Sequence, residues 1–297
     1  MIYLFAALTA AAGAFDSPAR QALYPSLVPT EHLANAVSLT SLMRQTASIV
    51  GPALAGFVLA YGGIAPVYWI NAASFLAVLV ALVMMRTHAQ QNRGGASMTP
   101  AALTEGIRFV FRSKMILSTM LLDFLATFFS SATSLLPIFA QEVLRVGAEG
   151  LGILYAAEAA GAVIAGAAMS LIGNLKKQGV ILLAAIAFYG VATTLYGMSQ
   201  WFVLSIFLLA LVGAADTVAT ILRNTIRQLA TPDHLRGRMT SINMIFFQGG
   251  PQLGNLEAGL VAAWIGAPLS VITGGIATVI LVGVTAWLIP QLRNYDA

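Results

Sequence analysis

Long apolar runs separated by short basic connections constrain this chain more than any other feature. An α-helix needs about 20 apolar residues to cross a bilayer. Eight runs reach or approach that length, at residues 36–60, 64–85, 115–140, 151–172, 180–198, 201–222, 239–264 and 267–289. A ninth run, residues 1–15, is shorter. Lipid offers no hydrogen-bond partner to unpaired strand backbone, so we predict an all-α polytopic membrane protein with about nine transmembrane helices.

The composition supports this prediction and excludes several classes of activity. Hydrophobic residues make up 59% of the 297 residues and charged residues only 9%, whereas soluble domains are about 25% charged. The absence of cysteine excludes disulfides and thiol chemistry. No glycine-rich phosphate loop and no Ser-His-Asp set or histidine cluster is present. We therefore expect neither an enzyme nor a metal or cofactor site, and no nucleic acid partner.

The basic residues predict the orientation of the chain. Thirteen of the 15 Lys and Arg residues lie in alternate connections, with Arg145 alone in an opposite-side loop and Arg44 inside a span. Loops rich in Lys and Arg are cytoplasmic in multi-pass membrane proteins. We therefore expect a protein of the bacterial inner membrane with a cytoplasmic C-terminus.

Three pairs of short segments recur in the same order at an offset of about 200 residues. The pairs are GAFD (13–16) with GAAD (213–216), LVPTEHL (27–33) with LATPDHL (229–235), and GPALAG (51–56) with GPQLGN (250–255). Three more spans precede the second copy, and none precedes the first. We therefore predict an incomplete six-plus-six design. It would consist of a partial N-terminal half (1–86), a cytoplasmic linker with an amphipathic helix (87–114) and a six-helix C-terminal half (115–297).

The chain resembles the major facilitator superfamily, and within it the bacterial exporter branch that includes enterobactin exporters and macrolide efflux proteins. The stretches FDSPARQALYPSLVPTEHLANAVSL, IVGPALAG, LLPIFAQEVLRVGAEGLGILYAAEAAGAVIAG and LATPDHLRGRM carry the resemblance. It implies that the first three transmembrane helices of the family are lacking. The family's Gly-Asp-Arg loop would lie in that part, and its second-half counterpart, GNLKKQG (173–179), has neither Asp nor Arg.

The repeated Gly-Pro segments predict bent, closely packed helices. Proline removes one backbone hydrogen bond, and glycines let a neighbouring helix approach. The resemblance implies an exporter motif in the first copy. We interpret the set as a helix-kink motif that serves motion between helices; packing without motion is the alternative. The set comprises Gly51, Pro52, Gly56, Gly250 and Pro251.

Five charged residues lie within predicted spans, where charge is costly and usually faces a cavity or a partner. They are Asp123, Glu158, Arg44, Asp216 and Glu257. We interpret them as candidates for coupling protons or substrate, with Asp123 and Glu158 foremost because both lie near mid-membrane. The alternative for the carboxylates is structural pairing with Ser, Thr or Asn on neighbouring helices. Arg44 could instead reach the cytoplasmic surface.

Two further pairs suggest a latch at the cytoplasmic end of the protein. Asp16 and Arg20 are four residues apart and can pair on one helix face. Asp216 with Arg223 is the corresponding pair in the second copy. The helix around Arg108 and Arg112 mixes cationic and aromatic residues, and we expect it to lie on anionic lipid.

We predict a secondary active transporter that exports small amphipathic molecules of the drug or siderophore class, as the resemblance implies. Protons are the expected coupling ion, alternating access the expected mechanism, and the lipid bilayer the surroundings. Two alternatives remain: a nutrient uptake permease, and a truncated membrane fragment that transports nothing.

Overall fold

The computed structural model describes residues 43, 47, 51, 54–59, 61–84, 100–130, 132–172, 176–232 and 235–295. The chain forms two units, one comprising Met1–Ala47 and Ala65–Ser97 and the other Ser48–Ile64 and Met98–Ala297. The helix α3 (Ile64–Met84) lies almost wholly in the first unit and contains no charged residue. The site described below lies in the second unit.

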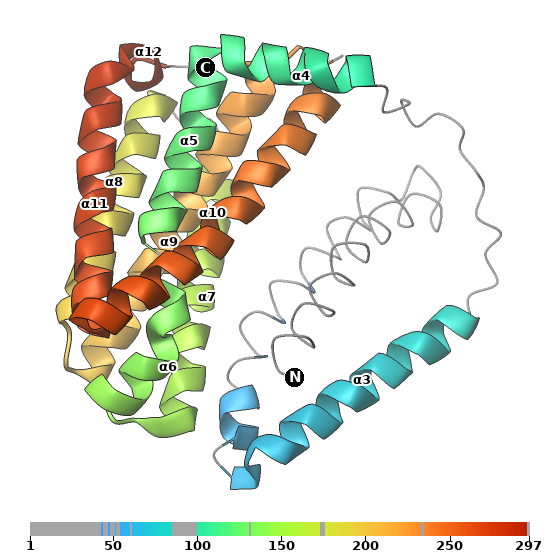
Figure 1. Ribbon diagram of the computed structural model, residues 1–297, viewed down its shortest axis with the longest axis vertical. Coiled ribbons are helices and arrows are strands. Elements are labelled where there is room, and N and C mark those ends of the chain that lie inside the picture. Colours follow the sequence, from blue (N-terminus) through green and yellow to red (C-terminus); the bar gives the residue numbers. More distant parts are fainter. Residues whose placement is uncertain are drawn as a thin grey trace. The chain divides into compact units, whose positions relative to one another are not determined.

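The second unit is a helical bundle with a short helix across one end (Figure 1). Its long helices are α5 (Lys114–Phe129), α7 (Gly147–Ile172), α8 (Gln178–Met198), α9 (Phe202–Leu229), α10 (Arg236–Ile265) and α11 (Ala267–Leu288). The amphipathic α4 (Pro100–Arg112) and the short α12 (Pro290–Arg293) lie at one end, here called the α4 end. At the other end, the α6 end, α5 continues through η2 (Ala132–Leu135), α6 (Leu136–Ile138) and η3 (Phe139–Val143).

Six helical segments in the described part of the chain are long and apolar enough to cross a membrane. One is α3, one runs from Lys114 to Val143, and the others are α7, α8, α9 and α11. The 30 residues of α10 could also span a bilayer by length, but its sequence is more polar. Each of these helices coincides with a predicted apolar run. The all-α prediction is therefore confirmed, whereas the predicted spans before residue 43 lie outside the described residues.

The helix α9 is longer than the apolar run predicted for it. The apolar run ends at Leu222, so Arg223 and Arg227 were assigned to a cytoplasmic connection, but α9 continues to Leu229. Both arginines are therefore helical, and each is only 2% exposed. Their guanidinium groups bond within the bundle, which is why the helix extends beyond its apolar segment.

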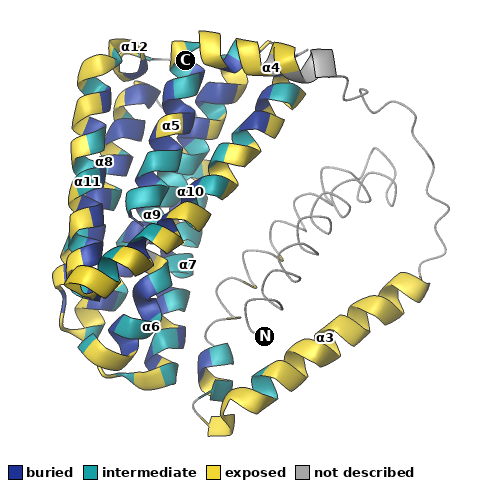
Figure 2. Cartoon of the chain, viewed as in Figure 1, coloured by how far each residue is buried: buried dark blue, intermediate teal, exposed yellow. Residues whose placement is uncertain are grey.

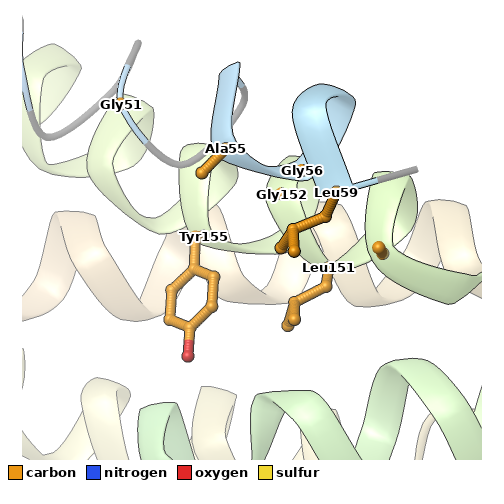
Figure 3. Close-up of a pocket in the computed structure, with 8 residues that line it drawn as sticks. Gly51, Ala55, Gly56, Leu59, Leu151, Gly152 and Tyr155 are labelled. Atoms are coloured by element: carbon orange, nitrogen blue, oxygen red, sulfur yellow. The ribbon is translucent and has the colours of Figure 1, made fainter. Parts of the chain in front are cut away.

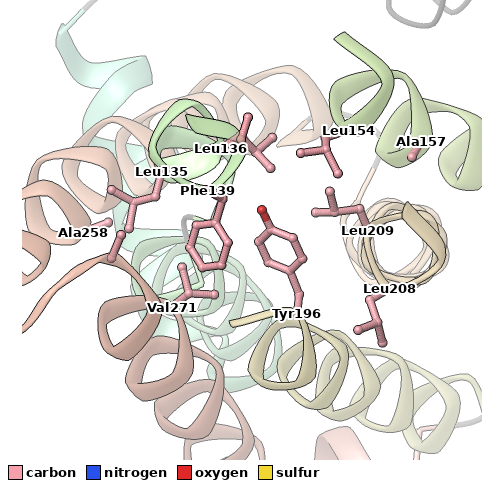
Figure 4. Packing of buried hydrophobic residues seen from close by; sticks show 12 residues of the cluster. Leu135, Leu136, Phe139, Leu154, Ala157, Tyr196, Leu208, Leu209, Ala258 and Val271 are labelled. Carbon is pink, nitrogen blue, oxygen red and sulfur yellow. The ribbon is translucent and has the colours of Figure 1, made fainter. Parts of the chain in front are cut away.

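Figure 2 shows which residues of the bundle are buried and which are exposed. Most of the buried side chains are apolar, and many large apolar side chains are exposed. At the α6 end, the ring of Phe139 stacks on Tyr196 with centroids 4.8 Å apart, surrounded by buried leucines (Figure 4). Large side chains such as Phe207, Trp264 and Trp287 remain exposed on the outside. Exposed apolar side chains on a spanning bundle are those that lipid tails would surround.

Glycines bring α7 and α9 into close contact. A Cβ atom built on Gly161 would overlap the carbonyl oxygen of Ala210, and one built on Gly213 would overlap that of Glu158. Small residues at helix interfaces allow this approach and the dispersion contacts that stabilise helix pairs in lipid. The contact places the backbone of Glu158 directly against α9.

We expect Gly161→Ala to lower the thermal unfolding midpoint of the purified chain in detergent. The added methyl group meets backbone that cannot rotate away, and overpacking of this kind costs about 1–3 kcal/mol. The matched control is Gly166→Ala on the same helix, where the nearest atom to a new Cβ is Thr217 Cγ2 at 3.7 Å. That control should be neutral or stabilising, because alanine favours helix over glycine by up to about 1 kcal/mol. Equal midpoints for the two variants would contradict the close packing.

Candidate functional site

A buried carboxylate on α5 is held by two arginines from α9. Arg223 Nη1 lies 3.0 Å from Asp123 Oδ1, and Arg227 Nη2 lies 3.2 Å from Asp123 Oδ2. All three side chains are at most 3% exposed. The arginines are four residues apart, so they project from the same face of α9. Each oxygen of the carboxylate therefore has its own guanidinium partner.

Arg227 links three helices. Its Nε donates to Thr119 Oγ1 at 3.0 Å, and its Nη2 donates to the Thr119 carbonyl at 2.8 Å. Its Nη1 donates to Asn243 Oδ1 on α10 at 2.6 Å. A buried charge is tolerable only when its hydrogen-bonding groups are satisfied. These bonds satisfy Arg227 and tie α5, α9 and α10 together.

Arg223 connects the buried Asp123 with a more exposed carboxylate. Its Nη2 donates to Thr220 Oγ1 at 2.7 Å and lies 3.4 Å from Asp216 Oδ1. The side chain of Asp216 is 46% exposed. The Nε atom of Arg223 is buried and has no hydrogen-bond partner among the described residues. Two carboxylates thus balance two guanidiniums, with one carboxylate reaching the bundle surface.

Glu158 on α7 has a different environment. Its carboxylate accepts hydrogen bonds from Thr133 Oγ1 at 3.2 and 3.4 Å, and within the described part of the chain no basic side chain forms an ion pair with it. Glu158 lies about 11 residues from the start of α7, roughly 17 Å along the helix and thus near its middle. Among the described residues, Glu158 therefore lacks the cationic partners that Asp123 has.

An apolar pocket lies between the segment around Gly56 and the first half of α7 (Figure 3). Its volume is about 380 Å³. The lining residues are mostly small or aliphatic: Gly51, Ala55, Gly56, Leu59, Ala148, Leu151, Gly152 and Tyr155. The Tyr155 hydroxyl donates to the carbonyl of Thr133 at 3.5 Å. The pocket wall is therefore connected through Thr133 to the carboxylate of Glu158.

Two helix-kink glycines, Gly56 and Gly250, pack against other helices, whereas a Cβ built on Gly51 would meet nothing within 4 Å. A Cβ built on Gly56 would lie 2.8 Å from the carbonyl oxygen of Ala148 on α7. A Cβ built on Gly250 would lie 3.0 Å from the carbonyl oxygen of Phe124 on α5, and Pro251 lies inside α10. Pro52 lies outside the described residues. Close approach is thus present at both copies, as either interpretation of the motif requires.

Some of the remaining coupling and latch residues lie among the described residues, and others do not. Asp16, Arg20 and Arg44 lie outside the described residues. Glu257 is half-buried on α10 and forms no ion pair with any described residue. Asp216 and Arg223 lie in contact, as the predicted latch requires.

Sequence reasoning missed Arg223 and Arg227 as partners of Asp123, and it missed Thr133 as the partner of Glu158. One signal for the arginines was present. Asp216, Arg223 and Arg227 are separated by seven and four residues, so a continued helix places all three on one face. The contact between Thr133 and Glu158 has no such signal, because it joins the irregular segment after α5 to the middle of α7.

Comparison with known proteins identifies the family. The family described as "Transmembrane secretion effector" (MFS_3) matches residues 1–297 of the chain. The "Enterobactin exporter EntS" of Salmonella typhi is 28% identical over 273 residues, which cover 91% of this chain and 65% of that protein. The proteins of the same name from Shigella boydii serotype 18 and Escherichia coli O1:K1 are 27% and 26% identical over 271 residues, with the same shares covered. The chain thus spans about 65% of the length of these relatives.

The all-helical bundle, its apolar spans and the match along the whole chain agree with one another. The chain therefore belongs to the transmembrane secretion effector family (MFS_3) of the major facilitator superfamily and is a multi-pass membrane protein.

Proposed function

We propose that this chain belongs to an efflux transporter that moves small amphipathic molecules across the bacterial inner membrane by alternating access, coupled to proton antiport. The family description and the relatives, named as enterobactin exporters, support export. Molecules of the drug or siderophore class are the proposed substrates. The apolar pocket beside Tyr155 is proposed to contribute to the substrate path, because apolar walls with few polar groups suit amphipathic ligands.

The environment of Glu158 is the observation that carries the coupling role. A carboxylate within a span marks a substrate or ion pathway by default. Glu158 lies near the middle of α7, with a threonine hydroxyl as its described partner and the pocket wall nearby. It can gain or lose a proton without breaking an ion pair to a described residue. We therefore assign proton exchange, or competition between proton and substrate, to Glu158.

Asp123 is assigned a positioning role. Each of its oxygens pairs with a guanidinium group of α9, so its carboxylate joins α5 to α9. Asp216 differs from both Glu158 and Asp123, because its side chain is partly exposed but also contacts Arg223. We propose that Asp216 and Arg223 connect the state of the exposed face to the buried network.

We expect Glu158→Gln to abolish proton-driven accumulation of a fluorescent cationic dye in everted membrane vesicles made acidic inside. The amide keeps the shape of the side chain and its bond with Thr133 but cannot exchange a proton. Glu149→Gln, in the exposed first turn of the same helix, is the matched control and should retain accumulation. Dye accumulation that depends on the pH gradient equally in both variants would refute the role of Glu158. Accumulation driven in the opposite direction would indicate uptake instead of export.

We expect Asp123→Asn to destabilise the bundle by about 3–5 kcal/mol, because it leaves Arg227 buried without an anionic partner. The double variant Asp123→Asn/Arg227→Gln removes that unpaired charge, while Arg223 keeps Asp216. It should regain most of the thermal stability lost and show dye accumulation. A stable but uncoupled double variant would instead make Asp123 a coupling residue.

We further propose that the α4 end of the bundle, and with it the C-terminus, faces the cytoplasm. Lys176 lies in the connection before α8, whose first turn bonds to Tyr295 just after α12, and Glu149 lies in the first turn of α7 at the other end. The chain has no native cysteine. In right-side-out vesicles, an impermeant maleimide should therefore label Glu149→Cys at once and Lys176→Cys only after permeabilisation. The reverse pattern would overturn the orientation.

A further inference from the structure

We propose that the outer face of α4 binds the anionic phospholipid headgroups of the membrane surface. This inference concerns an interaction surface and does not depend on transport. It rests on three observations: the arrangement of side chains on α4, the position of α4 relative to the first span of the bundle, and the charge of this end of the bundle.

Two stripes run side by side along the exposed part of α4. Ile107 and Phe111 are 40% and 60% exposed and four residues apart, so they form an apolar stripe. Arg108 and Arg112 are also exposed and four apart, and they form a basic stripe beside it. A helix that lies in a membrane interface buries its apolar stripe among the upper acyl chains and directs its basic stripe toward phosphate groups.

The opposite side of α4 is fixed to the bundle. Val110 is fully buried in a cluster with Ile116 and Met120 of α5 and Met239 and Ile242 of α10. Glu105, which lies beside the basic stripe because it is three residues before Arg108, forms an ion pair with Arg238 of α10. These contacts set the rotation of α4 about its axis. The two exposed stripes are therefore held away from the bundle.

The position of α4 matches the depth of lipid headgroups. The helix ends at Arg112, and the first span of the bundle begins at Lys114. Ser113 caps that span by accepting a hydrogen bond from the Ile116 amide at 3.4 Å. Figure 1 shows α4 lying across the end of the spans, not continuing them. A helix joined to a span by one residue and turned across it lies at the membrane surface.

The charge of this end selects anionic over zwitterionic lipid. The basic residues placed here within the described part of the chain are Arg108, Arg112, Lys114, Lys176, Lys177, Arg236, Arg238 and Arg293. Glu105 is the described acidic residue at this end, and Arg238 already pairs with it. The α6 end has Arg145 together with Glu142 and Glu149. Basic side chains clustered beside a span are attracted to anionic headgroups, and each contributes roughly fivefold in binding.

The test measures how the reconstituted 297-residue chain selects lipids. Spin-labelled phosphatidylglycerol and spin-labelled phosphatidylcholine are compared for their fraction immobilised at the protein, by electron paramagnetic resonance in phosphatidylcholine bilayers. The chain should prefer phosphatidylglycerol, and Arg108→Gln/Arg112→Gln should reduce that preference by about fivefold or more. Arg145→Gln, at the other end, is the control and should leave it unchanged.

A second measurement reports on the apolar stripe. A nitroxide on Ile107→Cys should be accessible to oxygen and shielded from a water-soluble nickel chelate in bilayers that contain phosphatidylglycerol. Adding Arg108→Gln/Arg112→Gln to this labelled chain should raise its accessibility to the chelate. An unchanged lipid preference in the arginine variant would overturn the proposal. A nitroxide shielded from both reagents would also overturn it, since protein would then cover this face of α4.

Discussion

The bundle depends most on the ion pairs that the carboxylate of Asp123 forms with two arginines. Asp123 lies on α5, while both of its partners, Arg223 and Arg227, come from α9, and Arg227 reaches on to α10. The hydrophobic effect does not drive lipid-exposed helices together, because the lipid tails are as apolar as the helix surfaces. A directed ionic contact between helices therefore specifies which faces meet. The close approach of α7 and α9 at Gly161 and Gly213 does the same by shape.

The two deep carboxylates have been given opposite environments by this packing. Asp123 is enclosed by guanidinium groups and is buried, whereas Glu158 has a hydroxyl partner near an apolar pocket. We propose that Asp123 keeps the helices together and that Glu158 exchanges protons. Asp216 contacts Arg223, which also pairs with Asp123. This contact supports the proposed connection between the exposed face and the buried network.

Much of the fold followed from one-dimensional patterns, but side-chain partners did not. Runs such as 180–198 and 267–289 match α8 and α11 to within two residues, because lipid requires a continuous apolar helix and sequence records that directly. The end of α9 was placed seven residues too early, since Arg223 looked like a loop cation. In a sequence, a charged residue is assigned to solvent unless its partner is known. The partner of Arg223 is Asp123, which lies 100 residues earlier in the chain.

The sequence by itself determined that this is a lipid-embedded all-α chain, where its described apolar helices lie, and that a Gly-Pro segment recurs in it. Each of these follows from local hydrophobicity or local identity. Only the tertiary structure decided that Asp123 is neutralised, that Glu158 lacks a described cationic partner, and that α4 lies across the end of the bundle. The reason is that the environment of a charge is set by side chains from other helices, and helix rotation and packing bring those side chains together.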